Sequence, residues 1–459
     1  MPRNSMDSQC SAVKGTKGGD DGRFYELEIG GGRVEDAGRS NADDLDPFKD
    51  PSLPTPEGPC DGGTQALLFF LSAFMVEALL WGMPATFGTF NAYYKKHPNF
   101  RDNHFIPVIG ALSTSLPFFG APLMTHFVTR YRQYQRQMVW VGSAICVLSL
   151  LLASFATQVW HLILTQGLGF GIGVLVVYYA VLEMLNSWFV ANRGTAYGLL
   201  FGAAGLAGIG LPFLFQWLLD TFDYSVTLRF YAFSLVCFVG TPMPFCRGRY
   251  TYTTSNPKSW ENFNHKILKN PDFCMFWGAN LFQGIAVMLP SIYITRFANI
   301  LNLPDVQGTM VLGLLLGTTV MSQVAIGKAT DRFRFSAVPI AAISSLVSAC
   351  LCILWLFSRS FISLLMFAIL FGLFAGGYST LWPRLNTSLS SCPDTQAFLY
   401  GFLACGRGFG VLVSILLSVF FLQHDGDSAQ NTVSGYSDMI MLAALVLSIS
   451  SLLSIASLA

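Results

Sequence analysis

Hydrophobic and polar positions along this chain are arranged in long blocks. From residue 65 onward, apolar stretches of about 20 residues recur between short polar segments, and each could cross about 30 Å of hydrocarbon as a helix. Twelve such segments are expected, at residues 66–93, 106–128, 137–156, 160–184, 194–219, 226–245, 273–296, 306–328, 336–357, 361–383, 396–421 and 437–458. The pattern therefore predicts an all-α polytopic membrane protein with twelve transmembrane helices.

The longest internal polar segment divides these helices into six and six. It covers residues 246–272, is basic and lacks apolar periodicity. Repeats of six helices with a site between the halves recur among secondary transporters. The expected units are a tail at residues 1–64, a first six-helix half at 65–245, a linker at 246–272 and a second half at 273–459.

Composition supports a membrane protein with a distinct N-terminal region. Hydrophobic residues make up 53% of the 459 positions and charged residues only 12%, whereas soluble domains have about 25% charged residues. Residues 1–64 hold 7 Lys/Arg and 13 Asp/Glu, which gives a net charge of −6. The other 395 residues hold 20 Lys/Arg and 13 Asp/Glu, which gives a net charge of +7. The first region is rich in Gly, Asp, Ser and Pro and is expected to be a disordered acidic tail.

The basic residues of the loops predict an orientation. If the N-terminal tail is cytosolic, alternation places 13 loop Lys/Arg on the cytosolic side and six on the other. This asymmetry follows the positive-inside rule and predicts that both termini are cytosolic. The plasma membrane is the expected location, with an internal membrane as the alternative.

Two charged residues lie deep inside predicted helices. An acidic residue at the centre of a membrane helix costs roughly 2.5–3.5 kcal/mol on insertion scales, so Glu77 and Arg407 require an explanation. Each is about twelve residues from the cytosolic start of its helix, or roughly 18 Å deep. Both are hypothesised to face a wet central cavity, with Arg407 either pairing with Glu77 or binding an anionic substrate. The alternative is that each charged group forms hydrogen bonds locally, with backbone groups or with hydroxyls such as that of Ser72.

Further polar and aromatic residues lie on helices that are expected to line the cavity. Hydrogen bonding within a helix, or ordinary packing, is the alternative role of each. The candidates for substrate or proton binding, besides Glu77 and Arg407, are Trp81, Tyr178, Asn280, Gln283, Thr319, Gln323 and Tyr378. Together they would form a mostly apolar and aromatic cavity with a few hydrogen-bonding groups.

Two motifs resemble those of a known family. The segment "GKATDRF", with Gly327, Asp331 and Arg332, resembles the loop motif of the major facilitator superfamily, whose Asp and Arg make gating contacts between helices. The segment "WFVANRGTAYGLLFGAAGLAGIGLP", residues 188–212, is similar to the helix 4–5 signature of the monocarboxylate porters, particularly the fungal ones. Its matching positions are Trp188, Phe189, Arg193, Gly194, Ala196, Gly198, Gly205 and Gly208. Small residues on one face let a helix approach its neighbour closely.

The resemblance implies the major facilitator fold and transport by alternating access, but one departure matters. Animal members that carry lactate with protons have an Asp and an Arg on helix 8, where this chain has Thr319 and Gln323. Export of a mid-sized organic acid or secondary metabolite is therefore the expected activity. Proton-coupled uptake of small monocarboxylates and a non-transporting sensor with a transporter fold are the alternatives.

Other classes lack their characteristic motifs. The sequence contains no P-loop, no Ser/His/Asp set and no Cys or His cluster with metal-ligand spacing, so no enzyme activity, cofactor or metal site is expected. A channel would require a charge ring or filter sequence, which is also missing. The expected partners are a small-molecule substrate, protons as a candidate coupling ion and the lipid bilayer, with no nucleic acid.

Overall fold

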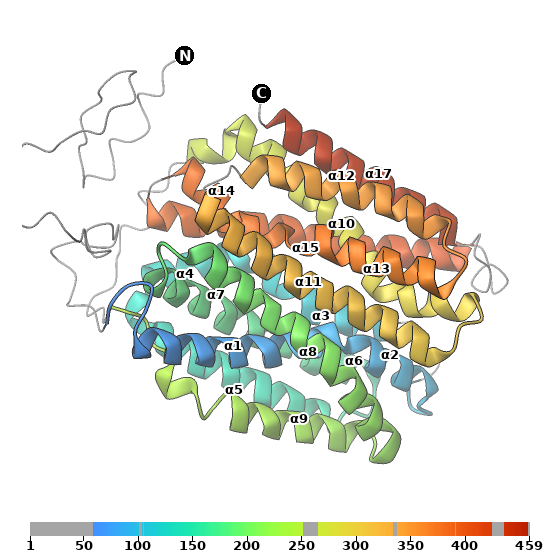
Figure 1. The fold of residues 1–459 in the computed structure, drawn as a ribbon. Coiled ribbons are helices and arrows are strands. Elements are labelled where there is room, and N and C mark those ends of the chain that lie inside the picture. The colour runs from blue at the N-terminus through green and yellow to red at the C-terminus, as the bar shows by residue number, and fades with distance from the viewer. Residues whose placement is uncertain are drawn as a thin grey trace, which may run out of the picture.

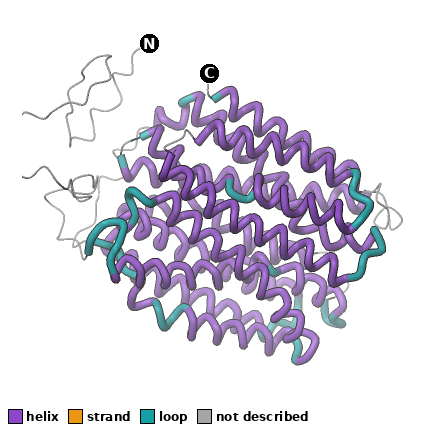
Figure 2. Tube along the Cα trace, in the orientation of Figure 1, coloured by secondary structure: helices purple, strands orange, loops and turns teal. Residues whose placement is uncertain are grey.

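The fold is a bundle of long helices that run side by side (Figures 1 and 2). The computed structural model describes residues 58–100, 103, 105–250, 265–333, 337–390, 392–424 and 436–457. Within these ranges all regular structure is helical. The helices α1 and α17 have their chain-terminal ends, Thr64 and Ala456, toward the left of Figure 1, and we call this end of the bundle the termini end.

Each predicted segment corresponds to one helix or to a helix that is broken once or twice. The first half comprises α1 (Thr64–Ala85), α2 (Phe87–Lys96), α3 (Ile106–Phe119), α4 (Ala121–Arg130), α5 (Gln135–Ala153), α6 (Val159–Leu162), the π-helix η3 (Ile163–Gly169), α7 (Phe170–Trp188), α8 (Arg193–Thr221) and α9 (Tyr224–Phe238). The second half comprises α10 (Pro271–Ile300), α11 (Asp305–Phe333), α12 (Ala337–Leu356), α13 (Phe361–Ala375), the 3-10 turn η6 (Tyr378–Leu381), α14 (Trp382–Leu389), α15 (Pro393–His424) and α17 (Ser437–Ala456).

Ten described helices are long and apolar enough to cross a membrane, and α3 with α4 makes eleven if that bent pair is one span. The sixth predicted segment, 226–245, is wrong in its length, because α9 has only 15 residues. At 1.5 Å per residue it is about 22 Å long. Gly240 and Pro242 follow α9 and disfavour its continuation. The polytopic helical architecture is confirmed, with one short member.

Proline and glycine cause several of the breaks. Pro84 precedes the break between α1 and α2, and the α3–α4 pair bends by 46° at Gly120, shortly after Pro117. Gly376 and Gly377 separate α13 from η6. These residues either lack an amide donor or lack a side chain that would favour continued helix.

The domain boundaries differ slightly from those expected. Residues 58–63 are not part of a disordered tail, because Asp61 accepts hydrogen bonds from the backbone of the α7–α8 loop. Cys246 and Arg249 are buried and therefore belong to the packed first half instead of the linker. Residues 1–57 and 251–264, which hold most of the expected tail and linker, lie outside the described residues.

Two sets of helix contacts join the halves. Within the first half α1 packs on α8 and α5 packs on α7, and within the second half α10 packs on α15 and α12 on α17. Across the boundary, α8 packs along α11, and α15 packs against α3 and α4. The first of these crossings is a backbone-to-backbone contact: a Cβ on Gly198 would lie 2.3 Å from the carbonyl oxygen of Gln323, and one on Gly327 would lie 2.3 Å from that of Gly194.

The close approach is confined to one end of this crossing. Gly205 also lies against α11, where a Cβ would be 2.4 Å from Val320. Farther along α8, Gly210 has no neighbour within 4 Å of such an atom, and neither does Gly313 on α11. The predicted small-residue face of α8 is therefore a real packing surface, and it holds the halves together near the termini end.

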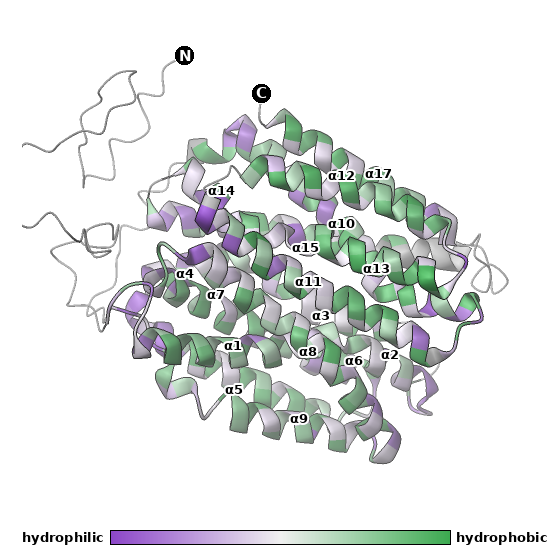
Figure 3. Ribbon diagram, viewed as in Figure 1, coloured by the Kyte–Doolittle hydropathy of each residue, from purple (hydrophilic) through white to green (hydrophobic). Residues whose placement is uncertain are grey.

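The outer surface of the bundle is suited to lipid. Hydrophobic residues dominate the middle of the helices, and hydrophilic residues gather mainly toward the ends (Figure 3). Large apolar side chains such as Phe155, Phe233 and Ile362 are exposed. A surface of this kind would be unfavourable in water and is favourable in hydrocarbon.

The substitution Gly198→Ala should destabilise the protein, because its methyl group would meet backbone that cannot rotate away. Overpacking costs about 1–3 kcal/mol, so the melting temperature of the purified protein should fall. Gly210→Ala is the matched control on the same helix, since its methyl group enters open space. Equal melting temperatures for the two variants would contradict the proposed importance of this contact.

Candidate functional site

Glu77 is buried, and no described residue pairs with its carboxylate. The residue lies on α1, is 4% exposed, and forms no hydrogen bond or ion pair within the described part of the chain. The hydroxyl of Ser72 donates instead to the carbonyl oxygens of Leu68 (2.7 Å) and Pro242 (3.0 Å). Local satisfaction by Ser72 is therefore wrong. The groups that interact electrostatically with the carboxylate include Tyr178 and Tyr179 of α7.

An aromatic cluster begins at Tyr178 and Tyr179, the two tyrosines that interact with this carboxylate, and crosses from one half to the other. Its members are Trp81, Tyr178, Tyr179, Tyr197, Trp382 and Tyr400. Trp81 contacts the ring of Tyr178 edge-on, with 5.4 Å between the ring centroids. The hydroxyls of Tyr178 and Tyr400 are 3.2 Å apart and hydrogen-bond across the boundary between α7 and α15.

Tyr400 was not among the residues predicted from sequence. It lies seven residues before Arg407 on α15, which is two helical turns and therefore the same side of the helix. That spacing is the signal that could have identified it. Tyr197 and Trp382 of the cluster give no comparable signal, because buried aromatic residues are common in helix cores.

Arg407 belongs to a second polar group, within the second half. Its Nη1 donates to Oε1 of Gln283 on α10, and its charge interacts with Tyr378 of η6. Gln283 also donates through Nε2 to the carbonyl oxygen of Ala375 at 3.3 Å. Asn280, one turn before Gln283, donates to the carbonyl oxygen of Leu403 at 2.6 Å, while its own Oδ1 is buried and accepts no bond from the described residues.

The structure does not bring Glu77 and Arg407 together as an ion pair. Among the described residues Arg407 has no carboxylate within ion-pair distance, and its hydrogen-bond partner is the neutral Gln283. The option that these two charges neutralise each other is therefore wrong for this conformation. Glu77 lies within the aromatic cluster, and Arg407 lies in the polar group of α10, α15 and η6.

Thr319 and Gln323, which lie on α11 in the eighth predicted span, have different roles. Thr319 donates to the carbonyl oxygen of Leu315 at 2.9 Å in its own helix and packs against Gly376, which is the local alternative to substrate binding. The side-chain oxygen of Gln323 is buried and accepts no hydrogen bond within the described chain. Of this pair, Gln323 alone has a buried polar atom that bonds to no described residue.

At the termini end, Asp331 links the halves. Its two carboxylate oxygens accept hydrogen bonds from the backbone N–H groups of Gly194 (2.8 Å) and Thr195 (2.6 Å), so a residue of α11 caps the first turn of α8. A carboxylate at a helix N-terminus is stabilised by the orphan N–H groups and by the helix dipole. Arg193 donates to Oε1 of Gln396 on α15 at 3.1 Å, while Arg332 is exposed.

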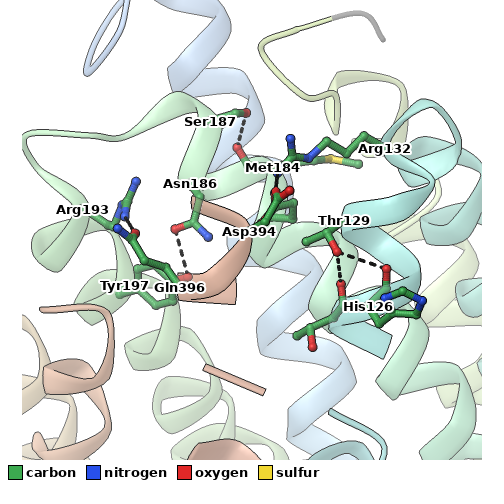
Figure 4. A network of polar contacts seen from close by, with 12 residues as sticks. His126, Thr129, Arg132, Met184, Asn186, Ser187, Arg193, Tyr197, Asp394 and Gln396 are labelled. Carbon is green, nitrogen blue, oxygen red and sulfur yellow. Dashed lines mark hydrogen bonds and ion pairs between the residues drawn. The ribbon is translucent and has the colours of Figure 1, made fainter. Parts of the chain in front are cut away.

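A charged triad closes the same end. Arg132 donates to a carboxylate oxygen of Glu183 on α7 at 3.0 Å and to one of Asp394 on α15 at 2.5 Å (Figure 4). The side chains are 11–21% exposed, so the three charges are shielded from water. None of these three residues was predicted from sequence as a site residue.

These contacts describe a transporter-like bundle that is closed at its termini end. The Asp331 cap, the Arg193–Gln396 hydrogen bond and the Arg132 triad all cross between the halves there. The aromatic cluster lies deeper, between these contacts and the second polar group. A molecule near Arg407 would have to displace both layers to leave through the termini end.

Comparison with known proteins gives the family. The sequence model of the Major Facilitator Superfamily matches residues 65–415. The MFS transporter asaE of Aspergillus flavus is 24% identical over 374 residues, which are 81% of this chain and 83% of that protein. The agnestins efflux protein AgnL12 of Paecilomyces divaricatus is 24% identical over 321 residues, or 69% and 72% of the two chains.

A third relative and a solved structure agree. Monocarboxylate transporter 13 of Bos taurus is 32% identical over 173 residues, which are 37% of this chain and 39% of that protein. The crystal structure of the human organic anion transporter MFSD10 (TETRAN) has a TM-score of 0.60 at 12% identity, covering 86% of this chain and all of that chain, and so shares its fold. The predicted family and fold are confirmed: the chain belongs to the Major Facilitator Superfamily.

Proposed function

We propose that this transporter exports a mid-sized organic acid or secondary metabolite by alternating access. The observation that carries the proposal is the surroundings of Arg407. Its guanidinium group has five N–H donors, and within the described chain its side-chain hydrogen bond goes to one oxygen of Gln283. Remaining donors can bind an anionic group, and binding of a carboxylate there would not require breaking an existing ion pair.

The size of the proposed substrate follows from the balance of polar and apolar groups. Small carboxylates have little apolar surface to offset the cost of leaving water. Thr319 and Gln323 of α11 supply no fixed charge that would compensate this cost. A larger acid can combine one anionic contact at Arg407 with burial of apolar area against aromatic residues such as Trp81.

One relative supports export, and another supports the alternative. The name of one fungal relative describes it as an efflux protein for agnestins, and another relative is a monocarboxylate transporter. The second name keeps proton-coupled uptake of small monocarboxylates as the competing function. In either case we assign proton binding to Glu77, because its buried carboxylate pairs with no described residue and interacts with Tyr178, whose hydroxyl bonds to Tyr400 of the other half.

We propose that both termini face the cytosol and that the protein resides in the plasma membrane. The termini end would then be the cytosolic end, and the structure would represent an outward-facing or occluded state. The support is the excess of Lys and Arg in the loops on that side. Residues of the 246–272 loop should be inaccessible to proteases or thiol reagents outside intact cells, and labelling there would contradict this topology.

Loss of the gene should cause the source organism to retain a metabolite. We expect comparison of intracellular and secreted metabolites to show accumulation of an apolar organic acid inside the deletion strain. Uptake of labelled lactate and pyruvate, measured in the same strains, should be unchanged. Unchanged secretion together with lost pyruvate uptake would reject export and favour the importer.

Replacing either deep charge should impair export of the retained compound without preventing membrane expression. A hydrogen bond to a charged group contributes about 1.5–3 kcal/mol, so Arg407→Ala should lower transport about 10- to 150-fold, and Arg407→Lys should retain part of the activity. Glu77→Gln, which conserves shape, should slow coupled transport. Wild-type transport rates in Arg407→Ala would disprove the anion contact. If each single variant failed to fold and the variant carrying both substitutions folded, Glu77 and Arg407 would form a structural pair instead.

A further inference from the structure

Two carboxylates hold the backbone that joins α7 to α8. Asp61, which precedes α1, accepts hydrogen bonds of 2.8–3.1 Å from the three N–H groups of residues 190–192. Asp331 of α11 accepts the N–H groups of Gly194 and Thr195 at 2.8 Å and 2.6 Å. The loop and the start of α8 thus rely on two side chains that are far from them in the sequence.

The start of α8 has no cap from within its own loop. A helix leaves its first four N–H groups without partners inside the helix, and the side chain of the N-cap residue often accepts one of them. The N-cap residue of α8 is Asn192, whose side chain makes no capping hydrogen bond. The first turn therefore depends on Asp331, and its approach to Asp331 depends on the shape of residues 190–192.

Asp61 is fixed to the first half by contacts around it. Its own N–H group donates to the carbonyl oxygen of Trp188 at 3.0 Å. Trp188 is buried at the end of α7 and stacks on Phe69 of α1, with 6.2 Å between the ring centroids. Nearby, the carbonyl oxygen of Gly58 accepts a hydrogen bond from Nε of the buried Arg249 at 3.0 Å. Asp61 is therefore part of the same packed unit as α1 and α7.

The two carboxylates differ in what happens to them when the halves part. Asp331 lies on α11, so its hydrogen bonds to α8 cross the boundary between the halves and must break when the termini end opens. The hydrogen bonds of Asp61 lie within the first half and can persist. A loop whose shape is kept in advance loses less conformational freedom when it meets its partner again. Asp61 thereby lowers the free-energy cost of closing the termini end.

We infer that Asp61 is a positioning residue for this closure: it holds residues 190–192 in the shape that presents the first turn of α8 to Asp331. The inference rests on the proposed alternating access, because it requires the termini end to open. It depends neither on the identity of the substrate nor on the direction of transport.

Replacing Asp61 should weaken the closed state without unfolding the protein. Ala191 and Asn192 are exposed, so water can replace the carboxylate as the acceptor of their N–H groups. Asp61→Ala removes both acceptor oxygens, whereas Asp61→Asn keeps one and should act less strongly in the same direction. If Asp61→Ala does not fold, Asp61→Asn and the hydrogen-exchange measurement below decide the matter.

Thiol labelling measures how often the termini end is open. Asn386 of α14 is 2% exposed and lines a small cavity between the halves with Glu183 and Arg193, so Asn386→Cys provides a thiol that a reagent reaches on opening. At low reagent concentration the labelling rate follows the fraction of open molecules. Mass spectrometry of the purified full chain identifies the labelled site, and the exposed Cys274 is the internal reference. Asp61→Ala should raise labelling of the introduced thiol about fivefold, the typical effect of losing one capping side chain.

A control and a double variant show whether Asp61 acts through Asp331. Asp272→Ala removes the same charge from the first turn of α10, which Asn270 caps, and should leave the labelling rate unchanged. Asp331→Ala removes the cap of α8 itself and should raise the rate at least as much as Asp61→Ala does. In the Asp331→Ala background, Asp61→Ala should add little, because the N–H groups that it presents no longer have their acceptor.

Hydrogen exchange of the protein without substitutions provides an independent measurement. The N–H groups of Gly194 and Thr195 should exchange faster than those of residues 190–192. Each opening breaks the hydrogen bonds to Asp331, whereas those to Asp61 persist, and exchange reports such local openings.

Several results would overturn the inference. Labelling of Asp61→Ala at the rate of its parent would remove the role of Asp61 in closure. Equal effects of Asp61→Ala with and without Asp331 would show that Asp61 only stabilises the first half, and equal exchange of all five N–H groups would show that both carboxylates release together. If the introduced thiol stayed unlabelled even in Asp331→Ala, the termini end would not open, and the proposed alternating access would fail together with the inference.

Discussion

The approach of α8 to α11 is the constraint on which the arrangement of the halves depends. Gly198 and Gly327 bring the two backbones so close that an added methyl group would overlap a carbonyl oxygen. This contact places the first turn of α8 within reach of Asp331, which caps it from the other half. It also brings Arg193 at the start of α8 and Lys328 and Arg332 at the end of α11 to the walls of one cavity at the termini end.

The deep charges are separated by this packing. Glu77 lies among tyrosines that join α7 to α15, whereas Arg407 is oriented by Gln283 within the second half. A buried charge without a counter-charge is costly, and both residues persist in an otherwise apolar interior. Under the proposed function, this separation would let a proton bind at Glu77 and an anionic substrate bind at Arg407, at different places in the bundle.

The features that could be predicted from sequence are local ones. Segment length and hydrophobicity located the spans, because a helix that crosses lipid must satisfy its own backbone over a fixed thickness. The glycine face of α8 was also predictable, since its residues recur on one side of one helix. The length of α9 was not, because Gly240 and Pro242 ended it within an apolar segment that hydropathy alone could not divide.

By itself the sequence determined the helical membrane architecture, the small-residue face and the two charges that have to be explained. Only the tertiary structure decided that Glu77 and Arg407 do not pair with each other, that Arg132 meets both Glu183 and Asp394, and that Tyr178 bonds to Tyr400. Depth along a helix follows from counting residues. The neighbour of a side chain follows from the rotation and lateral order of helices far apart in sequence, and no local pattern encodes these.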